Sequence, residues 1–344
     1  MTTLAGLATN ALLAGALLAG AWLVDRAVRR RVAPQVLTLV WFVALLRLVL
    51  PNELASPASV TAGLGASSRA AARTLGDAPE WLFGAWLVGA VALLTLRIVQ
   101  RFRLHSSLGA PVQLAPDWSD ALANAAKLAG LRRLPSVHAV ELTSPAVTGL
   151  WRPKLLLPAS ALERAPNRDD THALLHELTH LRRRDLLLDE AVALLRCVFW
   201  FQPLVWLAAV RLHELSELAC DADVATRLGR TSAYRATLVR AALSPAPTAA
   251  LPARAFLSSR PLLLRRLDAL ERPAPSPLAR RVALALALAC AAVALPMATP
   301  RGLDREHALA TLADAREGAP LSCFHLQAAA LVLSADPLPH EGTP

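Results

Sequence analysis

Long apolar stretches bounded by arginine dominate the hydrophobic pattern of this chain. A membrane-crossing helix needs about 20 predominantly apolar residues. Three stretches approach that length in residues 1–104, and a shorter one lies within 280–300. We therefore predict four transmembrane helices, at about 4–24, 36–50, 81–99 and 280–300.

Arginine marks one side of these predicted helices. It follows the first and third apolar stretches and precedes the fourth, and the positive-inside rule assigns such ends to the cytoplasm. Residues 52–79 then form an external loop, 105–279 a cytoplasmic domain and 301–344 a short external tail. A secretory signal peptide is excluded for the first stretch, because its positive charge would precede the apolar core.

The cytoplasmic segment has a mixed pattern. Asp120–Gly130 predicts a helix that ends at glycine. Ser136–Leu142 predicts a strand, and Ala146–Leu157 predicts extended chain with a turn inside it. Pro158 then opens a helical region. The fold class is α+β within a multi-span helical membrane protein.

The apolar stretch Leu186–Val210 permits two interpretations. It contains Asp189, Glu190, Arg196 and Pro203, which favours two helices that pack on the core or lie in the membrane face. The alternative is a fifth span. A fifth span would move everything after it to the other side of the membrane.

Composition supports a membrane protein. The 344 residues are 55% hydrophobic with mean hydropathy +0.41, which is high for a soluble domain. The net charge of +10 could indicate nucleic-acid binding, but the arginines flank apolar segments, so we expect a lipid bilayer and no direct nucleic-acid partner. The four cysteines show no paired spacing, which argues against a disulfide framework or a cysteine zinc site.

The chemistry of the chain centres on His176-Glu177-Leu178-Thr179-His180. Histidines four residues apart project from one face of a helix, so His176 and His180 can bind one Zn²⁺. Glu177 is placed to act as general base toward a water molecule, as in zinc peptidases. Two solvated histidines beside a surface glutamate are the ordinary alternative.

A catalytic zinc site needs a third protein ligand. Glu217 is the preferred candidate, although Glu214 lies on nearly the same face of the predicted helix. Asp221, one turn after Glu217, could orient a ligand histidine. Cys220 is near these positions, but its expected role is that of a small buried apolar residue.

Four ordered blocks resemble the BlaR/MecR antirepressor membrane zinc metallopeptidase family. The first is His176–Asp185, which is similar to the active-site helix of that family. The similarity includes the aspartate five residues after the second histidine, Asp185. The others are Ser144–Pro158, Phe199–Trp206 and Glu217–Asp221. Gln202 stands where that family more often has asparagine. Three predicted spans before the domain and one after it also agree.

The resemblance implies a gluzincin-like zinc endopeptidase in the bacterial inner membrane. It implies His176, His180 and Glu217 as zinc ligands, Glu177 as base, and Asp221 and Asp185 as residues that orient the histidines. The strand near Val147–Leu157 would carry an extended substrate by strand addition. Tyr234, His213 and the Arg260–Arg266 stretch are candidates to stabilise the oxyanion, and no choice among them follows from the sequence.

The implied substrate is a cytoplasmic protein, a transcriptional repressor, cleaved in a signalling pathway. The chain departs from the family in the expected lack of a penicillin-binding sensor: its only lysines are Lys127 and Lys154, and neither completes an S-x-x-K motif. The alternatives are a membrane quality-control peptidase, a CAAX-type processing peptidase, and a non-catalytic sensor or scaffold that keeps the fold. Glu177 favours an enzyme, and an oligomer is compatible with the sequence.

Overall fold

The computed structural model describes residues 2–29, 32–49, 80–229, 231–243 and 260–271, together with Arg281 and Ala285. The predicted external loop and tail, and all but two residues of the predicted fourth span, lie outside these ranges. The elements are α1 (Thr2–Val28), α2 (Pro34–Leu46), α4 (Glu80–Ser107), α5 (Pro116–Ala129), β1 (Ser136–Val140), β2 (Ala146–Thr148), β3 (Lys154–Pro158), α6 (Ala159–Leu162), α7 (Arg168–Arg183), α8 (Asp185–Val198), α9 (Pro203–Leu228), α10 (Thr231–Leu243) and α12 (Arg260–Glu271).

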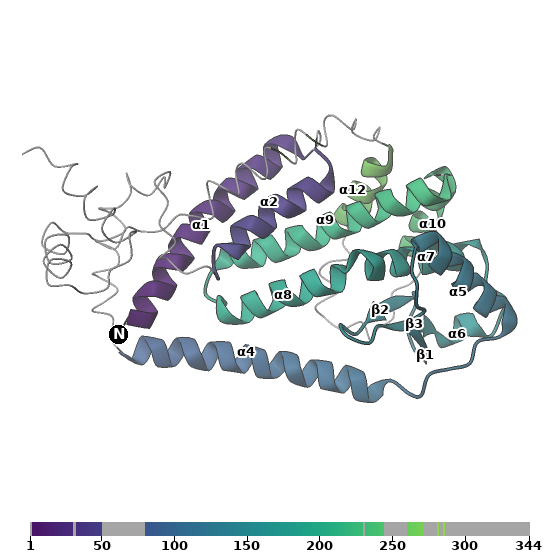
Figure 1. Ribbon diagram of the computed structural model, residues 1–344, viewed down its shortest axis with the longest axis horizontal. Helices are drawn as coiled ribbons and strands as arrows, with labels where there is room; N and C mark the ends of the chain where they lie inside the picture. The colour runs from purple at the N-terminus through teal and green to yellow at the C-terminus, as the bar shows by residue number, and fades with distance from the viewer. Residues whose placement is uncertain are drawn as a thin grey trace, which may run out of the picture.

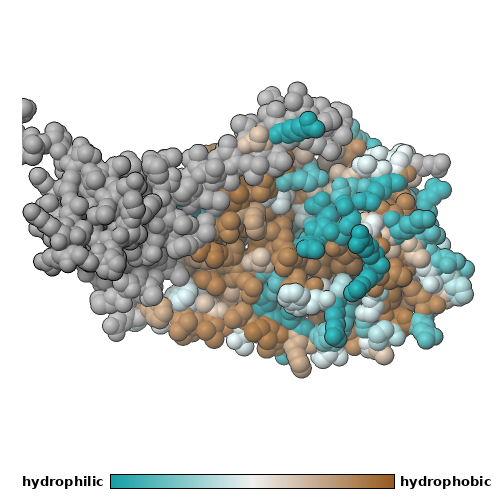
Figure 2. All heavy atoms as spheres, viewed as in Figure 1, coloured by the Kyte–Doolittle hydropathy of each residue, from teal (hydrophilic) through white to brown (hydrophobic). Residues whose placement is uncertain are grey.

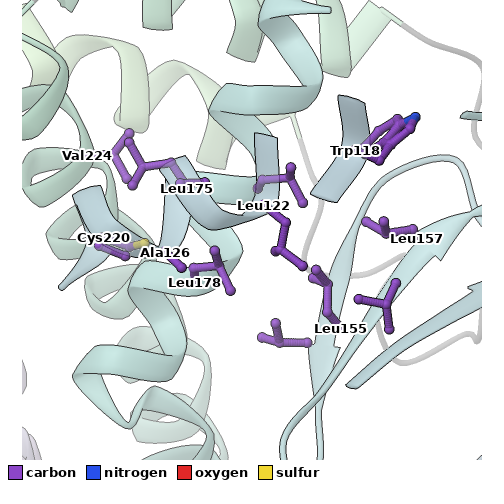
Figure 3. Packing of buried hydrophobic residues seen from close by; sticks show 14 of the residues in the cluster. Trp118, Leu122, Ala126, Leu155, Leu157, Leu175, Leu178, Cys220 and Val224 are labelled. Atoms are coloured by element: carbon purple, nitrogen blue, oxygen red, sulfur yellow. The ribbon is translucent and has the colours of Figure 1, made fainter. Parts of the chain in front are cut away.

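In the described part of the chain, a small mixed sheet and five helices, the short α6 among them, enclose the first of two cores. The sheet order is β1-β3-β2, with β3 parallel to β1 and antiparallel to β2. Helices α5, α7, α9 and α10 pack beside it, and Figure 3 shows Trp118, Leu155, Leu175 and Val224 from different elements in this core. The described part of the chain is thus mostly helical with some sheet, in agreement with the coarse α+β prediction.

Local signals explain where these elements start and stop. Gly130 ends α5 in the left-handed conformation (φ 78°), as predicted, whereas Pro116 starts that helix four residues earlier than expected. The Asn167 side chain accepts a hydrogen bond from the Asp170 amide, and the Asp170 side chain accepts one from the Asn167 amide. This capping box starts α7 and so sets the phase of the helix that carries the two histidines.

Helices α8 and α9 form a hairpin against α1 and α2, where the second core lies (Figure 1). The most deeply buried side chains of this core include Trp41 and Leu45 of α2 and Val205 of α9, each at most 1% exposed. The chain turns at 199–202, and Pro203 begins α9. The interpretation of 186–210 as two helices is therefore correct, and the fifth span is not formed.

Helix α4 has a different environment from the other long helices. Its apolar side chains are exposed, among them Val88, Leu96 and Phe102. Figure 2 shows hydrophobic surface along the lower edge of the molecule, where α4 runs in Figure 1. Among the described residues, one helix is long and apolar enough to cross a membrane, Trp81–Ser107, with 27 residues. Helix α2 has only 13 residues, fewer than a span requires, so the four-span topology stays a prediction.

Candidate metal centre

Helix α7 presents both predicted histidine ligands to one point. The Nε2 atoms of His176 and His180 lie 3.2 Å apart. Both side chains are largely buried, with 12% and 11% of their surface exposed. Two imidazole nitrogens that face each other so closely need a shared cation or proton between them, because two facing lone pairs would repel each other.

Helix α9 brings Glu217 to the same point. Its Oε2 lies 3.5 Å from His176 Nε2, and its Oε1 lies 3.4 Å from His180 Nε2. For zinc bonds of about 2.0–2.1 Å, tetrahedral ligands stand about 3.3 Å apart. The three separations match that value, so these residues fit a zinc ion.

Glu214, the alternative ligand on the same helix, lies elsewhere. Its carboxylate accepts hydrogen bonds from Arg211 and Arg265, each at 2.7 Å. One turn of helix separates the two glutamates, and the tertiary contacts give them different partners.

A carboxylate stands behind His180. Asp185 Oδ2 accepts a 2.7 Å hydrogen bond from His180 Nδ1, and it also accepts one from Arg183 Nε at 3.0 Å. Because Nδ1 is engaged, the lone pair of Nε2 points toward His176 and Glu217. Arg184 adopts a left-handed conformation (φ 61°) between α7 and α8, and this turn brings Asp185 back onto His180.

A longer chain of hydrogen bonds stands behind His176. Its Nδ1 lies 2.9 Å from the Tyr234 hydroxyl, which donates to Asp221 Oδ1 at 2.7 Å. Arg266 then donates two hydrogen bonds to Asp221, at 2.6 and 2.8 Å, and its Nη1 lies 3.0 Å from Glu217 Oε2. Asp221 thus acts on His176 mainly through Tyr234, since its own oxygen is 3.4 Å from Nδ1.

The protonation of the site follows from these contacts. Burial lowers the pKa of His180, but its hydrogen bonds to Asp185, Cys220 and Glu217 together outweigh burial, so the pKa lies well above its ordinary value. Burial raises the pKa of Glu217, but hydrogen bonds to His176 and His180 hold it well below the usual range. Burial likewise raises the pKa of Asp221, and Arg266 reverses the direction. The carboxylates are therefore ionised.

Cys220 of α9 is a further side chain close to the histidines that could bind a metal. Among the described residues, ligand atoms of His176, His180 and Cys220 lie within 4.8 Å of one another. The Cys220 Sγ approaches His176 at Nδ1, 3.5 Å away, and also contacts the His176 carbonyl at 3.4 Å. The side chain is fully buried and packs in the first core (Figure 3). The sulfur therefore lies close to both histidines and forms hydrogen bonds with each of them.

The remaining predicted residues occupy varied positions. Glu177 follows His176 on α7 and is partly buried. Tyr234 is 1% exposed and its hydroxyl is engaged behind His176, which favours a positioning role over contact with an oxyanion. His213 lies on α9, close enough to Asp189 of α8 to interact with it electrostatically. Within the Arg260–Arg266 stretch, Arg266 reaches the site.

Sequence reasoning did not assign the roles of Tyr234 and Arg266 as partners of Asp221, nor that of Arg183 as a partner of Asp185. No spacing rule points to the first two, which come from α10 and α12. Arg183 could have been found, because it is two residues from the aspartate that it contacts.

The described residues form a mostly helical protein with a small sheet and a buried group of residues that could bind a metal ion. The chain belongs to the BlaR1 peptidase M56 family, whose profile matches residues 6–270.

Curated relatives match a smaller part of the chain. The methicillin resistance mecR1 protein of Staphylococcus aureus is 26% identical over 93 residues, which cover 27% of this chain and 16% of that protein. The regulatory protein BlaR1 of Bacillus licheniformis is 34% identical over 87 residues, which cover 25% of this chain and 14% of that protein. The chain thus spans about a sixth of the length of the curated relatives that it matches. The resemblance to the BlaR/MecR family is confirmed by the family match.

Proposed function

We propose that this protein is a membrane-bound zinc endopeptidase that cleaves a cytoplasmic protein, a transcriptional repressor, in a signalling pathway. The observation that carries the proposal is the convergence of the two Nε2 atoms and the Glu217 carboxylate at 3.2–3.5 Å. Family membership and the names of the regulatory and resistance relatives support the same conclusion.

His176, His180 and Glu217 would hold the metal. Two imidazoles and one carboxylate form a donor set suited to catalytic zinc, which keeps one position open. Bound zinc supplies Lewis-acid chemistry, since it makes water more acidic and polarises a peptide carbonyl. Asp185, Tyr234 and the groups behind them keep both imidazoles in the tautomer that leaves Nε2 available.

Glu177 would move the proton. Its carboxylate accepts a proton from the water that attacks the peptide carbonyl, and it then delivers that proton to the departing amine nitrogen. The products are one carboxylate and one amine, so a single carboxyl group serves first as base and then as acid. The buried ligands around it could not replace this role, because their oxygens and nitrogens are already engaged.

The substrate would bind in extended form along the sheet. The predicted substrate segment near Val147–Leu157 includes β2 and β3, and β3 is the central strand with a neighbour on each side. This restricts the proposal to β2, Ala146–Thr148, which is the last strand in the sheet order and also contacts α7. A peptide added to β2 would run beside the helix that carries Glu177.

The membrane placement is part of the proposal. The exposed apolar surface of α4 and the apolar hairpin of α8 and α9 against α1 and α2 suit a bilayer. Such an arrangement in the bacterial inner membrane would leave the sheet and α7 in the cytoplasm, where a repressor is accessible.

The test compares wild type with Glu177→Gln, both purified as full chains in detergent with one equivalent of zinc. We expect Glu177→Gln to retain zinc but to lose self-cleavage and cleavage of β-casein by at least about 100-fold, the lower range for a general base. Glu163→Gln, which removes an exposed carboxylate at the end of α6, serves as the matched control. Undiminished cleavage by Glu177→Gln would contradict the mechanism.

The substrate class needs a separate measurement. New protein N-termini are compared in cells that express wild type or Glu177→Gln. Cleavage of a cytoplasmic DNA-binding protein only in wild type supports the repressor assignment. Cleavages confined to membrane proteins would instead favour the quality-control alternative.

A further inference from the structure

A cavity of about 290 Å³ lies between α1, α9 and α12, outside the metal centre. Four arginines contribute to its lining: Arg26, Arg29, Arg211 and Arg265. The volume is near the lower end of the range for small-molecule sites, about 300–1,000 Å³. So many guanidinium groups around one cavity indicate an anionic ligand.

The two acidic residues of the cavity are already neutralised. Asp25 is 4% exposed, and both of its oxygens accept hydrogen bonds from Arg211, with a further one from the Trp41 indole at 3.2 Å. Glu214 accepts hydrogen bonds from Arg211 and Arg265. Four positive charges and two negative charges leave a net charge of +2 in the lining.

The excess charge is on Arg26 and Arg29. Both side chains are exposed, and among the described residues no carboxylate lies within ion-pair distance of either one. The Arg26 guanidinium lies 5.7 Å from the centre of the Trp22 ring, which holds it beside the cavity. These two arginines are the groups available for an anion.

Part of the cavity lining is apolar. Trp22, Leu207 and Val210 line it, and they are 40%, 39% and 46% exposed. Neighbouring apolar side chains, Leu23 of α1 and Trp206 of α9, are exposed as well. An apolar surface that meets an arginine cluster at the end of an apolar helix is typical of the boundary between acyl chains and headgroups.

We propose that this cavity binds the headgroup phosphate of an anionic phospholipid. Arg26 and Arg29 contact the phosphate, while Arg211 and Arg265 keep the two carboxylates neutralised. The acyl chains lie against Trp22, Leu207 and Val210. The inference rests on the membrane placement in the proposed function, but not on proteolysis.

The site also lies close to the metal centre along two helices. Glu214 precedes the ligand Glu217 by one turn of α9, and Arg265 precedes Arg266, which contacts Glu217. A lipid in the cavity would therefore sit at the junction of α9 and α12 that positions the ligand carboxylate.

The test measures lipid binding to the full chain by native mass spectrometry in mild detergent. Phosphatidylglycerol is titrated against wild type and against the double variant Arg26→Gln/Arg29→Gln, with phosphatidylcholine as the zwitterionic comparison. An arginine near an anionic lipid contributes about 1 kcal/mol, so the double variant should bind the first phosphatidylglycerol about 30-fold more weakly. Wild type should prefer phosphatidylglycerol at one site.

The control variant is Arg103→Gln/Arg132→Gln, which removes the same charge at exposed positions outside the cavity. It should keep the affinity of wild type. Zinc content and far-ultraviolet circular dichroism establish that each variant is folded. An equal loss in both double variants, or no preference for phosphatidylglycerol in wild type, would overturn the proposal.

Two further measurements are needed. One distinguishes binding of a lipid from binding of free phosphate, and the other distinguishes failure of the lipid site from failure of the membrane placement. Binding of glycerol 3-phosphate or inorganic phosphate as tight as that of phosphatidylglycerol would overturn the lipid assignment, because it would leave no role for the apolar part of the lining. Release of the protein from membranes by alkaline carbonate would overturn the membrane placement itself. A protein that stays in the membrane, cleaves casein and shows no lipid preference would overturn the lipid site alone.

Discussion

Asp185→Asn should weaken zinc binding without unfolding the protein. Asp185 accepts the 2.7 Å hydrogen bond from His180 Nδ1, and its side chain is 8% exposed. Hydrogen bonds to charged groups contribute about 1.5–3 kcal/mol. Loss of such a partner behind a ligand histidine typically costs 10–100-fold in metal affinity. We therefore expect the zinc Kd to rise by about 10–100-fold, or about 1.4–2.8 kcal/mol.

The assay is competition with a chelating dye of known zinc affinity, at pH 8, on the purified full chain. The measurement is made at pH 8 because Asp185 also raises the pKa of His180, against the lowering by burial, and protons compete with zinc at lower pH. Loss of Asp185 relieves some of that competition and would hide part of the effect.

Asp223→Asn is the matched control for this prediction. Asp223 also contacts Arg183, at 3.5 Å, and it accepts a hydrogen bond from Arg182, so its ion pairs are with arginines rather than with a histidine. Its substitution should change the Kd by less than about threefold, the scale of an exposed ion pair. A Kd for Asp185→Asn equal to that of wild type, or an equal loss in Asp223→Asn, would refute the reasoning from the hydrogen bond.

Three other outcomes are expected. Glu217→Ala should lower zinc occupancy at least about tenfold in metal analysis of the purified chain, whereas Cys220→Ala should retain zinc. The reverse result would make the Cys220 thiol the third ligand. Zinc affinity should rise from about pH 6 to about pH 8. The two histidines have raised pKa values in the metal-free protein, so they must lose protons to bind the ion. Calorimetry in buffers of different ionisation enthalpy should detect this proton release. Gly149→Ala should lower the Tm. Gly149 has φ 88°, and an added Cβ would lie 2.5 Å from the Arg152 carbonyl oxygen, which implies a strain of at least about 1–2 kcal/mol. An unchanged Tm would contradict this prediction.

Local order along the chain was largely predictable. The four-residue spacing of the histidines, the glycine that ends α5 and the prolines that begin helices act over one or two turns of backbone, so they can be read without a fold. The interpretation of 186–210 as two helices was also correct, because charged residues and Pro203 interrupt the apolar run. The capping box at Asn167 was present in the sequence but was not used.

The contacts that complete the site depend on the tertiary structure. Spacing alone could not separate Glu217 from Glu214, since both lie on nearly one face of α9; the packing of α7 and α12 gives one to the histidines and the other to arginines. Tyr234 reaches His176 across 58 residues, and Arg211 reaches Asp25 across 186. The sequence by itself determined the histidine pair on α7 and the apolar helices. Only the tertiary structure decided which glutamate joins the two histidines, which groups stand behind the imidazoles, and where the arginine-lined cavity forms. The reason is that hydrogen bonds between distant segments depend on how whole helices pack.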